Sequence, residues 1–133
     1  MITALYTRKN SIYKKLGIDS WDIERDSRKW PGGTGIICHP PCRGWGNYRH
    51  LAKTRSDEHA LAIHSIIMIR LWGGVLEHPA GSQLWKAMNL PLPGQRDIYG
   101  GWTLCIDQNW FGHRAEKRTF LYIVGINPKE IPS

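Results

Sequence analysis

Cysteine is scarce in this sequence. Three cysteines stand among 133 residues, at positions 38, 42 and 105. An odd number without close pairing argues against a disulfide framework. There is no Cys-x-x-Cys motif, and His39 with Cys42 would supply only two of the four ligands that a structural zinc site uses. We therefore expect neither disulfides nor a bound metal.

Long apolar runs are also missing. No stretch approaches the length of a membrane span, and residues 1–8 lack the apolar middle of a signal peptide. We therefore expect a cytoplasmic protein that has no membrane partner. Hydrophobic residues make up 41% and charged residues 22%, which is ordinary for a folded domain. The length suits one such domain over 1–126, followed by a flexible tail at 127–133.

Acidic residues are few compared with basic ones. Eleven Asp and Glu face 18 Lys and Arg, which gives a formal net charge of +7. A basic balance favours polyanionic partners, so we expect a nucleic acid or a nucleotide.

Apolar runs and turn residues predict an alternation of strands and helices. The expected strands are 2–7, 20–24, 35–38, 75–77, 102–106 and 119–124, and the expected helices are 11–16, 56–72 and 82–88. Apolar positions 60, 63, 67 and 71 form one stripe of the long helix and 61, 68 and 72 a second, so we expect it to be well covered. The alternation over the first hundred residues favours an α/β fold, a Rossmann-like three-layer sandwich with a mostly parallel sheet.

Polar clusters follow several of the expected strands. In parallel sheets, ligands bind beyond the carboxyl ends of the strands. The clusters are Arg8 to Ser11, His39 to Arg43, and Glu77-His78. Arg8 and Lys9 stand beside a helix start and could hold a phosphate, or they could be ordinary exposed cations.

Two prolines precede Cys42. Prolines fix φ and remove backbone donors, so Pro40-Pro41 would form a stiff platform. Cys42 could act as a nucleophile if Arg43 or His39 lowered its pKa. The alternative is a rigid strand exit with a buried, inert cysteine.

Glu77 directly follows the apolar run Gly-Val-Leu. A carboxylate there could act as a general acid or accept a hydrogen bond from a base edge. The alternative is an ordinary cap or ion pair. Cations and aromatics over 110–119 would suit an anionic ligand or a nucleic-acid backbone, or would form a solvated turn.

Taken in order, these clusters resemble the cytosine-C5 DNA methyltransferase family. That family has a Pro-Cys nucleophile loop, a strand ending in Glu-Asn-Val, and a Gln-x-Arg-x-Arg segment before a strand that ends near Val-Gly. The corresponding segments here are 41–46, Glu77-His78-Pro79, and His113 to Arg118 with Val124-Gly125. The chain is also similar to short phage-encoded DNA-methylase-like proteins, which share the Pro-Pro-Cys and Glu-x-Pro pair.

The resemblance implies roles for particular residues. Cys42 would attack C6 of a pyrimidine, and Glu77 would hold the N3 edge and help to protonate it. A base in a duplex would have to be flipped out. The implied substrate-binding residues are Pro41, Arg43, His78, His113, Arg114 and Arg118. The implied sites for S-adenosylmethionine are Arg8, Ser11, Asp22 and Glu24.

The sequence departs from the family at three places. Residues 7–11 replace the glycine-rich loop that binds the methyl donor. His78 and Pro79 replace Asn and Val. The chain has no room for a target-recognition domain, so sequence-specific reading would need a partner or a second copy, as in a homodimer. Three hypotheses stay open: a C5 transferase of a phage or prophage in the host cytoplasm, a non-catalytic nucleic-acid or nucleotide-binding protein acting against host defence, and an enzyme acting on free nucleotides.

Overall fold

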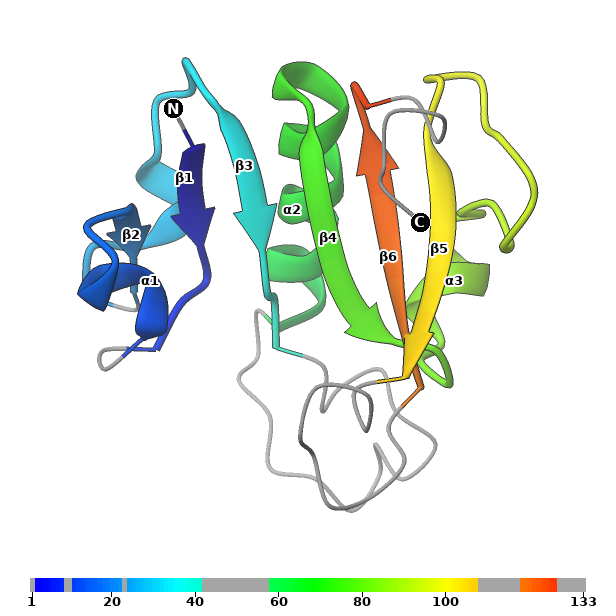
Figure 1. Ribbon diagram of the computed structural model, residues 1–133, viewed down its shortest axis with the longest axis horizontal. Helices are drawn as coiled ribbons and strands as arrows, with labels where there is room; N and C mark the ends of the chain where they lie inside the picture. Colours follow the sequence, from blue (N-terminus) through cyan, green and yellow to red (C-terminus); the bar gives the residue numbers. More distant parts are fainter. Residues whose placement is uncertain (1, 9–10, 23, 42–57, 108–117, 127–133) are drawn as a thin grey trace.

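A six-stranded sheet organises the protein. The computed structural model describes residues 2–8, 11–22, 24–41, 58–107 and 118–126. The strands are β1 (Ile2–Leu5), β2 (Asp19–Trp21), β3 (Gly35–Cys38), β4 (Gly74–Pro79), β5 (Trp102–Asp107) and β6 (Arg118–Val124). The helices are α1 (Ile12–Lys15), the 3₁₀ turn η1 (Ser27–Lys29), α2 (Glu58–Trp72) and α3 (Leu84–Ala87). The order across the sheet is β2-β1-β3-β4-β6-β5 (Figure 1).

The sheet has a parallel half and an antiparallel half. Strand β1 pairs in parallel with β2 and with β3, and β3 pairs in parallel with β4. Strand β6 runs antiparallel to both β4 and β5. The carboxyl ends of β1 to β4 therefore lie at the edge of the sheet where β6 begins (Figure 1).

The expected Rossmann-like three-layer sandwich with a mostly parallel sheet is wrong. Two of the five strand pairings are antiparallel. A parallel α/β sandwich also needs crossover helices long enough to cover both faces of the sheet. Here α1 and α3 have four residues each and η1 has three. Among the described elements only α2 is long enough to form a helical layer, and it lies behind the sheet as Figure 1 is drawn.

The core lies between α2 and the sheet. Helix α2 packs on β3, β4 and β6. Its buried side chains are Leu61, Ala62, Ser65, Ile66 and Ile69. They meet core side chains from the strands, among them Leu5, Ile36, Cys38, Leu76, Tyr122 and Val124.

The expectation that the long helix is well covered is also wrong. Ile67 and Leu71, two members of the first expected stripe, are 46% and 68% exposed. The residues that face the sheet are 61, 62, 65, 66 and 69, and this set includes a serine. The hydroxyl of Ser65 donates to the carbonyl of Leu61 at 3.1 Å, which is how a polar residue is accommodated there.

Within the described residues, the expected strands and α-helices occur in the expected order with shifts of a few residues at their ends, and the 3₁₀ turn η1 was not expected. The expected tail at 127–133 lies outside the described residues. No helix in the described ranges has the length and apolar character needed to cross a membrane.

Two glycines join α2 to β4. The Gly73 N–H donates to the Ile69 carbonyl at 2.8 Å, and Gly73 has a φ of +80°. Gly74 has a φ of +143°, and a Cβ on it would lie 2.0 Å from the carbonyl oxygen of Ile36. Only glycine allows the backbone of β4 to approach β3 this closely.

We expect Gly74→Ala to lower the free energy of unfolding by more than about 3 kcal/mol, because it adds a backbone clash to an unfavourable φ. Gly17→Ala is the matched control. Gly17 has a φ of +77°, and a Cβ added to it would meet nothing within 4 Å, so strain alone should cost about 1 kcal/mol. Urea denaturation of both variants checks this. Equal losses would contradict the close contact between β3 and β4.

Candidate functional site

One edge of the sheet gathers most of the predicted site residues. Strands β1 to β4 are parallel and end there, and β6 starts there (Figure 1). The predicted residues found near this edge are Arg8, Ser11, Asp22, Glu24, Pro41, Glu77 and Arg118. Cys42, Arg43, His113 and Arg114 lie outside the described residues. The described residues Arg8, Ser11, His39 and Glu77 of the three predicted clusters thus follow or end strands that finish at this edge, whereas the His78 side chain lies elsewhere.

Glu77 is paired with His39. In the register of β3 against β4, Cys38 lies beside Leu76. The residues that follow them, His39 and Glu77, are therefore neighbours as well. His39 Nδ1 lies 3.2 Å from Glu77 Oε2. The two side chains keep 28% and 31% of their surface exposed, so solvent or a ligand can reach the pair.

Tyr13 of α1 completes a chain of three side chains. Its hydroxyl lies 2.7 Å from His39 Nε2, and the two rings have centroids 5.5 Å apart. Burial and then the negative charge of Glu77 raise the pKa of Tyr13. The phenol therefore keeps its proton at neutral pH. We call this set the Tyr13–His39–Glu77 chain.

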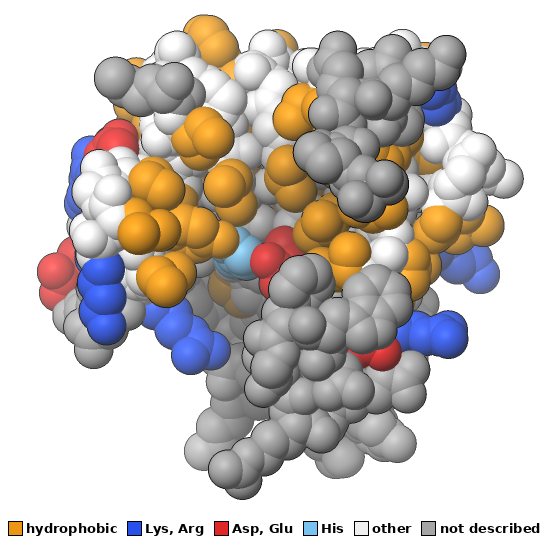
Figure 2. Space-filling model, in the orientation of Figure 1, with side chains coloured by type: hydrophobic (Ala, Val, Ile, Leu, Met, Phe, Trp, Pro, Cys, Tyr) orange, Lys and Arg blue, Asp and Glu red, His pale blue; other side chains and the backbone are white. Residues whose placement is uncertain are grey.

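The Tyr13–His39–Glu77 chain lies on the face of the sheet that α2 does not cover. Because side chains alternate along a strand, Val75 and Glu77 share one face of β4, and the register places Leu121 of β6 opposite Glu77. Figure 2 shows hydrophobic side chains over much of this face, with a histidine and a carboxylate side by side among them. Apolar surface next to a fixed acceptor suits a flat, partly polar ligand such as a base.

His78 is not part of this arrangement. It follows Glu77 in β4, so its side chain points to the opposite face, where it is 1% exposed. Its Nε2 lies 2.7 Å from the hydroxyl of Ser82. Burial lowers the pKa of His78 to about 4, so the ring is neutral. The structure thus separates His78 from Glu77 and from His39, and the predicted substrate contact by His78 is not supported.

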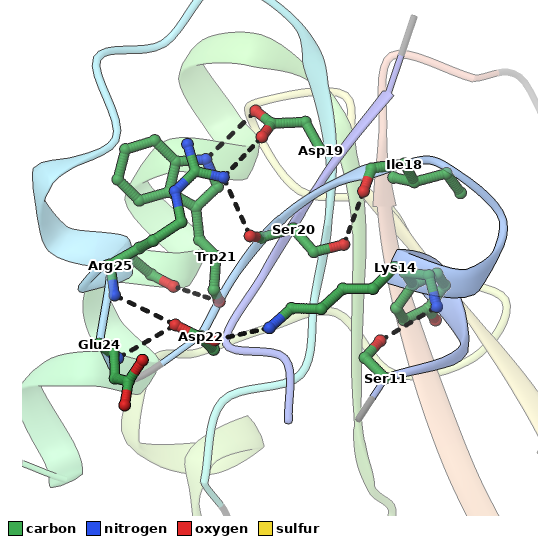
Figure 3. A network of polar contacts seen from close by, with 11 residues as sticks. Ser11, Lys14, Ile18, Asp19, Ser20, Trp21, Asp22, Glu24 and Arg25 are labelled. Atoms are coloured by element: carbon green, nitrogen blue, oxygen red, sulfur yellow. Dashed lines mark hydrogen bonds and ion pairs between the residues drawn. The ribbon is translucent and has the colours of Figure 1, made fainter. Parts of the chain in front are cut away.

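Asp22, an implied cofactor residue, is used inside the protein. One carboxylate oxygen lies 2.5 Å from Lys14 Nζ, and the other accepts from the backbone N–H groups of Glu24 and Arg25 at 3.1 Å (Figure 3). The hydrogen bond from Lys14, followed by that from the Arg25 amide, lowers the pKa of Asp22 to about 2. The carboxylate is only 9% exposed and ties α1 to the end of β2.

The other implied cofactor residues also have local roles or are exposed. The Ser11 hydroxyl accepts from the Tyr13 backbone N–H at 3.0 Å and caps α1. Glu24 and Arg8 are exposed. Arg8 stands where the family has glycines, and Asp22 is committed to Lys14. These residues do not fit an S-adenosylmethionine site of the family's kind.

Two further predicted residues belong to segments that meet this edge of the sheet. Pro41 is half-buried and follows a buried Pro40, as expected of a stiff strand exit. Arg118 is exposed at the start of β6, which pairs with the end of β4. It brings positive charge to the same edge. Among the described residues, no group of three or more His, Cys, Asp or Glu is placed to hold a metal ion.

A cavity of about 610 Å³ opens at the opposite edge of the sheet, between the end of α2 and residues 88–99. Arg70 lies 4.1 Å above the ring of Tyr99 and 3.7 Å from a carboxylate oxygen of Asp97. The backbone N–H groups of Tyr99 and Gly101 donate to the other oxygen of Asp97. These groups mainly stabilise one another, and the cavity holds no predicted site residue.

From the sequence, His39 was expected in a cluster that follows a strand, as an aid to Cys42 and as one of two possible metal ligands, but not as the partner of Glu77. Tyr13 was not expected at the site. Nothing local in the sequence places Tyr13 against a residue 26 positions away.

No protein-family model matches this chain, and no curated protein matches it. The resemblance to cytosine-C5 methyltransferases therefore stays a prediction from the motifs.

The Asp22 ion pair predicts a pH dependence of stability. The folded-state pKa of about 2 lies below the unfolded value of about 3.9. Ionised Asp22 therefore contributes its full stabilisation above about pH 3.9, and this stabilisation is lost as the pH falls from there toward about 2. We expect urea denaturation to show that the free energy of unfolding falls less between about pH 4 and about pH 2 in Asp22→Asn than in the wild type. Parallel losses would contradict the pairing. Lys14→Met should give a loss between those of Asp22→Asn and the wild type, because the backbone N–H groups of Glu24 and Arg25 still lower the pKa of Asp22.

Proposed function

We propose that this protein engages a pyrimidine base of nucleic acid at the edge formed by β3 and β4. Glu77 would contact the base, and Cys42 would be the nucleophile. The observation that carries the proposal is the placement of Glu77. It is partly exposed, held by His39 at the end of β4, and adjacent to the strand that leads into Pro40-Pro41-Cys42.

The proposed chemistry is a reversible addition to the base. The thiol of Cys42 gives up its proton and its sulfur bonds to C6, while the electron pair of the C5–C6 double bond moves to C5. C5 takes a proton from water, and the hydroxide that remains takes the thiol proton. A carboxyl group at the N3 edge stabilises the charge that builds up in the ring. The resemblance implies methyl transfer as the next step. Because Asp22 and Arg8 do not fit the donor, we derive no step that uses it.

Covalent trapping tests this function. The protein is incubated with DNA containing 5-azacytosine, in which a nitrogen replaces C5 and the product of addition at C6 is longer-lived without a methyl donor. The reaction is run with and without S-adenosylmethionine and analysed on a denaturing gel. We expect an adduct that disappears in Cys42→Ala and falls roughly a hundredfold in rate in Glu77→Gln. Cys105→Ala is the matched control, because Cys105 is an exposed cysteine elsewhere on the sheet and should leave the adduct unchanged.

Each gel result has one meaning. An adduct that needs S-adenosylmethionine would establish C5 methyl transfer and overturn our conclusion that the donor does not fit. A missing adduct with retained DNA binding would leave only the binding function. If the protein neither forms an adduct nor shifts DNA on a native gel, the proposal for nucleic acid is wrong and free nucleotides become the ligands to screen.

A second candidate function is nucleic-acid or nucleotide binding without catalysis. The engagement of Asp22 by Lys14 favours it, because the implied donor contact is occupied by the protein itself. The net charge of +7 agrees with a polyanionic ligand.

Salt-dependent binding tests this candidate. We expect Arg118→Gln and Arg8→Gln each to reduce the slope of log Kd against log salt by about 1, as loss of one phosphate contact does. Cys42→Ala should bind normally. Arg96→Gln at the opposite edge is the control and should keep the slope. A slope unchanged in both edge variants would exclude this edge as the phosphate-contacting surface.

A further inference from the structure

We propose that Tyr13 and His39 are positioning residues for Glu77: the phenol of Tyr13 fixes the tautomer of His39, and His39 in turn holds Glu77 as an ionised hydrogen-bond acceptor. The role of Glu77 toward a base rests on the proposed function. The hydrogen-bond direction within the chain does not, and it can be tested by itself.

The direction follows from the two groups at the ends of the chain. The carboxylate of Glu77 beside Nδ1 can only accept, and the phenol of Tyr13 stays protonated because its pKa is raised, so we infer that the Tyr13 O–H donates to His39 Nε2 across 2.7 Å. A nitrogen that accepts carries no proton. In neutral histidine the single ring proton must then sit on Nδ1, which donates to Glu77 Oε2 across 3.2 Å. Glu77 accepts that hydrogen bond as a carboxylate.

The position of Tyr13 is itself fixed by its neighbours. The backbone N–H of Tyr13 donates to the Ser11 hydroxyl, which sets the first turn of α1. The next residue, Lys14, is held 2.5 Å from Asp22 at the end of β2 (Figure 3). Asp22 stands where the resemblance implies a cofactor contact. In this chain it anchors the short helix that presents Tyr13.

Three separate elements thus meet in one chain of hydrogen bonds. Tyr13 comes from α1, His39 from the end of β3, and Glu77 from β4. An imidazole bonded at both nitrogens cannot rotate without losing a contact, so it restricts the carboxylate to one orientation.

Nitrogen NMR of the 133-residue chain tests the tautomer. At about pH 8, where an ordinary histidine is neutral, we expect the ¹⁵N signals of His39 to show a protonated Nδ1 and an unprotonated Nε2. In Tyr13→Phe the signals should lose this single pattern, while in Tyr99→Phe, a tyrosine near the opposite edge, they should keep it. The inference would be overturned if the wild type carried a proton on Nε2 or on both nitrogens. It would also be overturned if Tyr13→Phe kept the wild-type pattern.

Substitution of His39 tests the positioning of Glu77. An Asn side chain can place its amide nitrogen near the position of Nδ1, whereas Gln places it nearer to Nε2. We expect the ¹³C signal of the Glu77 carboxylate to stay closer to wild type in His39→Asn than in His39→Gln. Equal shifts in both variants would overturn the positioning role. A folded-state check by near-UV circular dichroism separates this result from unfolding.

DNA binding provides the functional readout. We expect Tyr13→Phe to weaken adduct formation or binding about two- to tenfold, as loss of one hydrogen bond does, and His39→Asn to rescue part of the loss seen in His39→Gln. If wild-type protein neither binds nor is trapped, the proposed function fails while the NMR results still decide this inference. If DNA binds but these variants do not affect it, the positioning role is overturned.

Discussion

Strand β3 pairs in parallel with β4 so that Cys38 lies beside Leu76, and the residues that follow come out next to each other. The contact requires Gly74, since a side chain there would collide with the Ile36 carbonyl. This register brings His39 to Glu77, and it makes the segment that begins with Pro40 and Pro41 leave the sheet beside the same carboxylate. The proposed chemistry therefore depends on a backbone contact between two strands.

Alternation along β4 divides the two polar residues of the Glu-His-Pro segment. Glu77 points to the face without α2, where Tyr13 and His39 reach it, whereas His78 is buried on the other face and bonds to Ser82. Asp22 also has a structural role, because it anchors α1 through Lys14 instead of facing a ligand. The fold thus uses one acidic residue to place the helix and leaves the other accessible at the edge of the sheet.

Local patterns predicted the elements well and the architecture poorly. Apolar runs ended by glycine or proline marked the strands and α2, and the rule about strand carboxyl ends located Glu77 and Pro41. Such runs do not indicate whether neighbouring strands pair in parallel or antiparallel. No helix was expected between the strands 102–106 and 119–124, and this did indicate their antiparallel pairing. The period of two in a strand could have separated Glu77 from His78. The contact of Tyr13 with His39 depends on tertiary packing, and the sequence carries no local signal for it.

A ligand site at the edge where β3 and β4 end is what the proposed function requires, and amide chemical-shift mapping tests for it most directly. A ¹⁵N-labelled protein would be titrated with a short single-stranded oligonucleotide rich in cytosine. The account predicts that the largest shifts fall on Tyr13, His39 and Glu77 and their neighbours, while Asp97 and Tyr99 stay unchanged. Shifts confined to the cavity beside Asp97 and Tyr99 would contradict it.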